Sequence, residues 1–282
     1  MKVSVSIVTY QQAGFIRQAV ESALNQVADF PFEVIVGDDA STDGTCDVLA
    51  ELRQNAPDQL RLILAERNYG DFGLTNVMAT IDEARGEYIA FLDGDDYWTS
   101  TDKLRRQVAF MDAHPDCAIS SHRVAHVTAD GVQGLSVRPG DGDGLWEFER
   151  LLIVNFTPKS ATMIRRSALA HLPDWYRKTE ISSAAWLFNL LVADGGRIGY
   201  IDEVMADHRV HDQSVTAYYG NERMLVDKLS VFDALDPLVP QHRKALKIAR
   251  GRVNLKLYAL RYAPHGFRMA RHLFNRISAR RR

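Results

Sequence analysis

Four short apolar segments, each rich in strand-forming residues, most restrict the fold that this sequence can adopt. They are residues 3–8, 32–36, 60–64 and 88–92. Between them, apolar residues recur at helical spacing over 14–26, 44–55 and 77–84, so that strands return about every 28 residues. Such alternation is typical of right-handed β-α-β units. The sequence therefore predicts an α/β fold with a mostly parallel central sheet flanked by helices.

The pattern is less regular after residue 98. We expect helices over 104–113 and 186–193, strands at 117–127, 161–164 and 198–201, and a mobile loop over the glycine- and aspartate-rich segment 131–144. From about residue 221 onward the apolar spacing predicts helices. The sheet is therefore expected to be followed by a C-terminal helical extension.

The strand predicted at 88–92 is followed by Asp93, Asp95 and Asp96, with Gly94 between them. In open α/β sheets, ligands bind at the carboxyl ends of the strands. Carboxylates this close repel one another, and a divalent cation with hard oxygen ligands relieves that repulsion. The favoured interpretation is Mg²⁺ or Mn²⁺ shared with the phosphates of a substrate. A solvated acidic turn is the alternative.

Polar residues also follow two other predicted strands. Asp38 and Asp39 come after the second strand, and Thr9 and Tyr10 end the first. Turn chemistry alone explains each of these clusters, because such residues are common in loops. If the strand ends meet at one edge of the sheet, they form a single polar crevice.

Overall charge and cysteine content bound the partners and the compartment. The 282 residues carry a net charge of -2, which argues against nucleic acid as a partner. Cys46 and Cys117 lack a CxxC spacing, as is typical of a reducing compartment. No apolar run approaches the roughly 18 residues needed to span a bilayer. We expect no signal peptide and therefore a cytoplasmic protein.

Four stretches of the chain resemble family 2 glycosyltransferases of the GT-A fold. They are Val3–Tyr10, Glu33–Thr45, Gly86–Trp98 and Gly196–His211. The resemblance implies inverting transfer of a sugar from a nucleotide-diphosphate sugar to a hydroxyl of a glycan or lipid-linked acceptor. Bacterial surface polysaccharide synthesis is the expected setting, with a UDP-sugar as donor and Mn²⁺ or Mg²⁺ as cofactor.

The resemblance also implies roles for individual residues near the metal. Asp95 is the expected first ligand, and Asp93 and Asp96 are expected to assist it. His211 resembles a late metal or diphosphate ligand, with an ordinary polar loop histidine as the alternative.

In the nucleotide pocket, the resemblance implies that Asp38 or Asp39 accepts a hydrogen bond from the base. Thr9 and Tyr10 are expected to flank the base, and Asn68 to close over the ribose. Asp93 and Gly94 are expected to contribute to the same pocket.

One position departs from the family pattern. An inverting transferase needs a general base, and the resemblance places it at Ala185, just before Trp186. Alanine cannot accept a proton. The favoured interpretation is an aspartate-to-alanine change that inactivates the chain, because the other motifs are intact. There are two alternatives. Another carboxylate, such as Glu180, acts as the general base, or the protein binds nucleotide-sugar without turning it over.

A nucleotidyltransferase is a second enzyme class that combines an α/β sheet with metal-binding carboxylates. Such an enzyme is expected to have a glycine- and lysine/arginine-rich phosphate loop after the first strand. Residues 11–14 do not provide one, so this class is ranked below a glycosyltransferase.

The resemblance suggests a catalytic domain over 1–220, with a nucleotide-binding half (1–98) and an acceptor half (99–220), followed by a basic helical extension over 221–282. Residues 264–282 mix apolar and basic side chains, as is typical of a helix at the surface of an anionic membrane. Peripheral contact with the inner face of the cell membrane is one expectation for this segment. Docking on its own domain or on the partner of a homodimer is the other.

Overall fold

The computed structural model describes residues 1–211 and 215–262. The chain forms two compact units, Met1–His211 and Asp212–Arg282. The segment 264–282, for which membrane contact was expected, lies outside the described residues.

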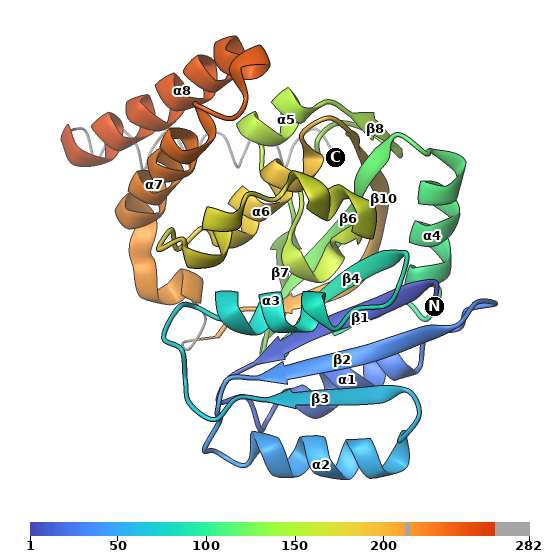
Figure 1. Cartoon of the computed structure of the whole chain (residues 1–282). Coiled ribbons are helices and arrows are strands. Elements are labelled where there is room, and N and C mark those ends of the chain that lie inside the picture. Colours follow the sequence, from blue (N-terminus) through green and yellow to red (C-terminus); the bar gives the residue numbers. More distant parts are fainter. Residues whose placement is uncertain (212–214, 263–282) are drawn as a thin grey trace. The chain divides into compact units, whose positions relative to one another are not determined.

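The first half of the first unit is a parallel sheet with helical connections (Figure 1). Its strands are β1 (Val3–Thr9), β2 (Phe32–Asp38), β3 (Leu60–Leu64) and β4 (Tyr88–Asp93). The connecting helices are α1 (Ile16–Leu24), α2 (Thr45–Asn55) and α3 (Leu74–Asp82). Because β1 to β3 step in one direction and β4 returns beside β1, α3 covers the opposite face from α1 and α2. Every strand and helix predicted in this half is confirmed.

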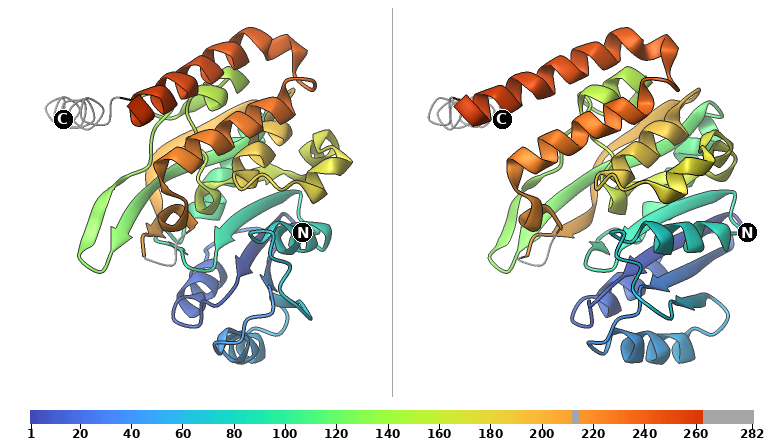
Figure 2. Two further views of the ribbon diagram at one scale, coloured as in Figure 1. Left: turned by 90° about the vertical axis from the view of Figure 1, so that its left-hand side faces the viewer. Right: turned by 60° about the vertical axis from the view of Figure 1, so that its left-hand side comes forward.

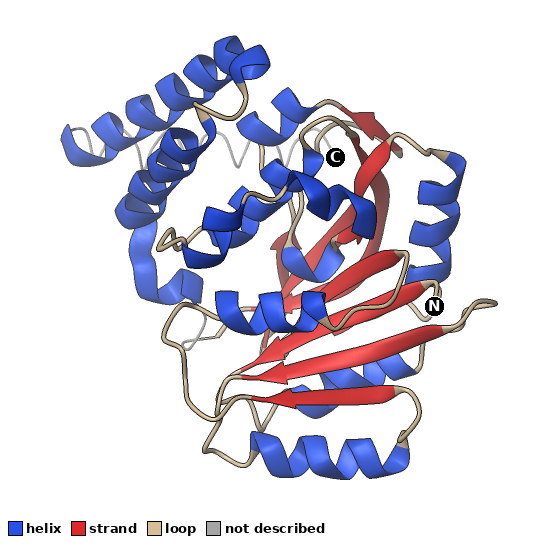
Figure 3. Ribbon diagram, in the orientation of Figure 1, coloured by secondary structure: helices blue, strands red, loops and turns tan. Residues whose placement is uncertain are grey.

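The second half extends the same sheet, which becomes mixed (Figure 3). The full order is β3-β2-β1-β4-β9-β6-β10-β5. The added strands are β5 (Tyr97–Trp98), β6 (Cys117–Thr128), β9 (Met163–Arg165) and β10 (Arg197–Arg209). The helices of this half are α4 (Lys103–Ala113), α5 (Phe148–Ile153) and α6 (Ala184–Ala193). β9 is antiparallel to β4 and β6, whereas β10 runs parallel to β6. The predicted α/β fold with a mostly parallel sheet is confirmed.

The segment 131–144, expected to be a mobile loop, is partly ordered as strand. β7 (Gly131–Leu135) pairs antiparallel with β6, and β8 (Gly144–Trp146) pairs antiparallel with β10. The φ angle of Gly131 is +103°, which suits the tight return from β6 into β7. Gly131 therefore makes the turn, while hydrogen bonds to β6 stabilise the strand.

The strand expected at 198–201 is much longer than the sequence indicated. β10 continues to Arg209 because β6 beside it is equally extended, and shifts in register absorb the polar residues Asp202 and Glu203. The strand expected at 161–164 begins two residues later, at Met163, after a short 3₁₀ turn over Lys159–Ala161. The N-cap of α2 is Gly44, in a left-handed conformation.

His122, inside β6, makes the stability of the first unit depend on pH. Burial and then the charge of Lys103 lower the pKa of His122 to about 3, against a hydrogen bond to the carbonyl of Arg123. Below pH 6.5 an unfolded histidine gains a proton that the folded one does not bind. We expect His122 to reduce the free energy of unfolding by about 1.4 kcal/mol per pH unit as pH falls from 6.5 towards 3.

Urea denaturation at several pH values checks this expectation, with His122→Phe as the comparison. The variant should lose that part of the pH dependence, whatever its stability at neutral pH. An unchanged slope in the variant would contradict the assignment.

The second unit contains a helical hairpin. α7 (Val215–Leu235) and α8 (Arg243–Tyr262) lie side by side and are joined through a 3₁₀ turn, η4 (Pro240–His242) (Figure 2). Helices were predicted from about residue 221, and the structure begins α7 at Val215. Within the ranges that the structure describes, no helix is long and apolar enough to cross a membrane.

Candidate active site

The carboxyl ends of β1, β2 and β4 bring both acidic clusters to the same edge of the sheet. In the strand registers, Thr9 lies beside Asp38, and Val8 lies beside Asp93. A Cβ placed on Gly94 would lie only 2.8 Å from Cβ of Thr9. The close approach therefore requires glycine at position 94. It brings the end of β1 directly against the residues that follow β4.

The two neighbouring carboxylates after β2 have different surroundings. Asp38 is fully buried and accepts hydrogen bonds from the amide (2.8 Å) and the hydroxyl (2.6 Å) of Ser41. Asp39 accepts hydrogen bonds from the Asn68 side chain (2.9 Å) and the Tyr69 amide (3.0 Å). Asp38 thus holds its own loop together, whereas Asp39 ties that loop to Asn68. Tyr10 is about half exposed.

The pKa of Asp39 reflects its surroundings at the end of β2. Burial raises it above its ordinary value, the hydrogen bond from Tyr69 opposes the rise, and the charges of Asp71 and Asp38 add to it. A hydrogen-bond donor from a ligand would therefore stabilise the charged form of Asp39.

Asp95 faces the residues that follow β10. His211 Nε2 lies 3.1 Å from Asp95 Oδ2, across 116 positions of sequence. The ring of Phe15 stacks on His211 with a centroid distance of 5.0 Å. Burial raises the pKa of Asp95, the charges of Asp93 and Asp96 raise it further, and the hydrogen bond with His211 lowers it. Asp95 is therefore a partly buried carboxylate, and its hydrogen bond with His211 does not offset the negative charges of Asp93 and Asp96.

This pair fits a divalent cation by its chemistry. A carboxylate oxygen and an imidazole nitrogen are both ligands that Mn²⁺ accepts. Among residues 1–211 and 215–262, no group of three or more histidine, cysteine or acidic side chains is placed to hold a metal ion. A cation at Asp95 and His211 would take its other ligands from a diphosphate and water, as Mg²⁺ commonly does.

The other two carboxylates of the cluster already have partners within the protein. Asp93 Oδ1 accepts a hydrogen bond from Lys159 Nζ at 2.6 Å. Asp96 is 1% exposed and accepts hydrogen bonds from the hydroxyl of Ser160, from the amide of Arg209 (3.0 Å) and from His208 Nδ1 (3.1 Å). These two carboxylates are therefore less free than Asp95 to bind a ligand.

His208 carries positive charge in this arrangement. Burial lowers its pKa, but the hydrogen bond with Asp96 and the charges of Asp96, Asp93 and Asp95 outweigh burial and raise the pKa to about 9. The His208–Asp96 contact is therefore an ion pair at neutral pH, which fixes the end of β10 against the end of β4.

Arg209 makes a second connection between the end of β10 and the residues that follow β4. Its Nη1 donates a hydrogen bond to the backbone carbonyl of Asp95 at 2.5 Å. Its guanidinium lies 4.5 Å from the centroid of the Tyr97 ring and 5.2 Å from that of Phe15. The aromatic contacts and the hydrogen bond together orient the backbone of Asp95.

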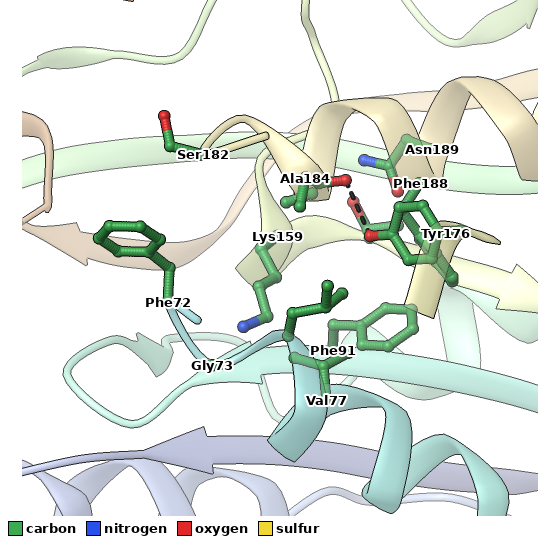
Figure 4. A pocket seen from close by; sticks show the side chains of 13 residues that line it. Phe72, Gly73, Val77, Phe91, Lys159, Tyr176, Ser182, Ala184, Phe188 and Asn189 are labelled. Atoms are coloured by element: carbon green, nitrogen blue, oxygen red, sulfur yellow. Dashed lines mark hydrogen bonds between the residues drawn. The ribbon is translucent and has the colours of Figure 1, made fainter. Parts of the chain in front are cut away.

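A cavity of about 100 Å³ lies between β4, α3 and the first turn of α6 (Figure 4). Its walls are mainly apolar, from Phe72, Leu74, Val77, Phe91, Tyr176 and Phe188. Ala185 is exposed and lines the cavity, as does Lys159. The described residues that line it include no aspartate, glutamate or histidine. Glu180 is exposed and lies outside this lining.

Sequence reasoning missed several residues of the site. Lys159, Ser160, His208 and Arg209 had no assigned role, although all four contact the 93–96 cluster. Lys159 and Ser160 lie within the short 3₁₀ turn before β9, and no periodic signal marks them. A signal did exist for His208 and Arg209, because two basic residues at the end of a predicted strand are suited to pair with the acidic residues that follow β4.

Comparison with known proteins relates the chain to a family. The family model described as "Glycosyl transferase family 2" matches residues 4–172. The chain is 30% identical over 248 residues to an uncharacterised protein of Mycobacterium tuberculosis, covering 86% of this chain and 70% of that protein. It is 40% identical over 112 residues to the Escherichia coli enzyme WfaP, a UDP-Glc:alpha-D-GlcNAc-diphosphoundecaprenol beta-1,3-glucosyltransferase, covering 39% of this chain and 41% of the enzyme.

Solved structures share the fold. TarS residues 1–349 from Staphylococcus aureus, in complex with UDP, align with a TM-score of 0.68 and 22% identity, over 95% of this chain and 74% of that one. A mannosyltransferase from Pyrobaculum calidifontis, in complex with GDP-Man and Mn²⁺, aligns with a TM-score of 0.62 and 19% identity, over 98% of this chain and 80% of that one.

The fold and the family match define a glycosyltransferase that uses nucleotide-sugars and has the GT-A architecture. The chain belongs to glycosyl transferase family 2.

Proposed function

We propose that the chain transfers a sugar, with inversion, from a UDP-sugar to a hydroxyl of a glycan or lipid-linked acceptor in bacterial surface polysaccharide synthesis. The observation that carries this proposal is the convergence of Asp95 and His211, at 3.1 Å, on the same sheet edge as Asp39. The names of WfaP and of the UDP-bound TarS structure support UDP as the nucleotide.

The donor is held, in this proposal, by residues at the strand ends. Asp95 and His211 bind Mn²⁺ or Mg²⁺, which when bound stabilises negative charge on the departing diphosphate. Asp39 accepts the hydrogen bond from the base, because burial and the charges of Asp71 and Asp38 favour a further donor there. Asp38 is fully buried and holds its own loop through Ser41. Thr9 and Tyr10 flank the base, and Asn68 meets the ribose. Gly94 lets the residues after β4 approach Thr9. Asp93 and Asp96 hold this edge of the sheet through Lys159 and His208.

The acceptor occupies, in this proposal, the cavity beside Ala185. Lys159 connects the two sites, because it lines the cavity and pairs with Asp93. With alanine at the base position, the described lining of the cavity offers no carboxylate or imidazole to take the proton of the acceptor hydroxyl. We therefore infer that the chain binds donor well and turns it over slowly.

The absence of an acidic or histidine side chain from the described cavity lining favours one second candidate, a protein that binds nucleotide-sugar without turning it over. The two candidates share the same donor site. They differ in whether any transfer occurs, and substitution of Ala185 by aspartate distinguishes them.

A thermal-shift panel tests the donor assignment. We expect UDP-sugars with Mn²⁺ to raise the melting temperature by about 5–10 °C at 100 times the dissociation constant, because binding to the folded state alone adds about 2.7 kcal/mol. GDP- and dTDP-sugars should give smaller shifts, and chelation of the metal should remove most of the UDP-sugar shift. Stabilisation by nucleoside triphosphates but by no sugar nucleotide would point to a nucleotidyltransferase instead.

A further inference from the structure

Helix α8 has two apolar faces, and only one of them is buried. Leu246, Ala249, Val253 and Leu257 form the buried face. Another four apolar side chains are 46–71% exposed and form what we call the exposed stripe: Ile248, Leu255, Tyr258 and Tyr262. At about 100° per residue, these four fall within roughly 80° of one another and on the side of the helix away from the buried face. Packing within a helical hairpin accounts for the first face and leaves the exposed stripe unexplained.

The exposed stripe is bordered by positive charge. The helix contains seven basic residues and no acidic one. Two of the basic residues are paired with α7, since Arg250 contacts Asp233 (2.5 Å) and Arg261 contacts Glu222 (2.7 Å). The other five have no hydrogen-bond or ion-pair partner in the described part of the chain: Arg243, Lys244, Lys247, Arg252 and Lys256.

These five unpaired residues surround the stripe. On the helical projection, Lys244 falls within the stripe, and Arg252 and Lys247 lie next to its two borders. Lys256 and Arg243 lie farther out, beyond Arg252 and Lys247 respectively. Apolar and unpaired basic side chains therefore share one surface of α8.

We propose that the exposed stripe of α8 and its basic borders form a docking surface for an anionic lipid bilayer. Apolar side chains enter the boundary between headgroups and acyl chains, while lysine and arginine remain at the charged headgroups. The rings of Tyr258 and Tyr262 lie 4.9 Å apart at one end of the stripe, and tyrosine favours this interfacial depth.

Charge argues against a second copy of the chain as the occupant. Joining two copies through this face would bring five unpaired basic residues on one helix against the same five on the other. Like charges directly opposed across an interface are unfavourable. An anionic bilayer meets both the apolar and the basic part of the surface. The inference concerns α8 alone and does not depend on the donor or acceptor proposed above.

Co-sedimentation of the full chain with lipid vesicles tests this surface. The wild-type chain should bind vesicles that contain phosphatidylglycerol, bind pure phosphatidylcholine much less, and lose binding as salt increases. The double variant Leu255→Glu/Tyr258→Glu should reduce partitioning about tenfold or more, because it places charge at two lipid-facing positions.

A matched control separates this effect from a general change in charge. Val132→Glu/Val137→Glu adds the same two negative charges at exposed positions of the first unit, where the side chains are 66% and 60% exposed. It should bind vesicles as the wild type does, and both variants should keep the wild-type melting temperature.

Two results would overturn the proposal. The first is equal vesicle binding by the α8 variant and the wild type. The second is a concentration-dependent dimer, seen by sedimentation velocity, that the α8 variant dissolves, because the stripe would then be an interface between copies.

Discussion

Replacement of Asp95 by asparagine is expected to remove the metal-dependent part of nucleotide binding and to lower donor turnover by about 10³-fold or more. A metal that stabilises charge on a leaving diphosphate contributes several kcal/mol to the transition state, and about 1.4 kcal/mol corresponds to each factor of ten. The change removes a charged oxygen ligand and leaves His211 facing a neutral amide. Calorimetric titration of UDP with and without Mn²⁺ measures the binding loss, and release of UDP from the donor measures turnover.

The control for Asp95→Asn is Asp130→Asn, the same change at an exposed turn between β6 and β7. It should leave binding and turnover unchanged. His211→Ala should resemble Asp95→Asn, and the double variant should lose little more than either single one, because both residues act on one ion. Metal-dependent UDP binding that survives Asp95→Asn would place the cation elsewhere.

The parallel half of the sheet was predictable because its signals are local. Buried parallel strands such as Tyr88–Asp93 are continuous apolar runs, and their helices repeat apolar residues on one face. The strand ends follow from these runs, so the meeting of Asp38 and Asp93 at one edge could be expected from the amino-acid sequence alone.

The second half of the sheet depends on long-range contacts that no local sequence pattern indicates. β7 and the long end of β10 are stabilised by hydrogen bonds to β6. The glycines of 131–144 indicated a loop, so β7 could not be predicted from the sequence. Lys159 reaches Asp93 from an irregular turn 66 positions away. Such residues are placed by tertiary packing, and no period or local propensity reports them.

Ala185→Asp is expected to raise the rate of sugar transfer by about 10²–10⁴-fold, the usual contribution of a positioned general base. Ala185 is exposed in the first turn of α6 and lines the cavity, so an aspartate there can reach an acceptor hydroxyl. A negative charge in the first turn of a helix is also favourable, because the helix N-terminus carries partial positive charge. Nucleotide affinity should hardly change, since the proposed donor site is at the strand ends.

The matched control is Ala185→Asn, which has nearly the same shape as aspartate and cannot take a proton. If the base interpretation is right, only aspartate raises the rate, and the gain grows with pH as the carboxyl ionises. An equal gain with asparagine would mean that the side chain improves acceptor binding instead. If the Ala185 chain already transfers sugar as fast as the aspartate variant, the proton acceptor lies elsewhere, and Glu180→Gln becomes the next test. No transfer by either protein, with donor binding intact, would favour the binding protein that was the second candidate.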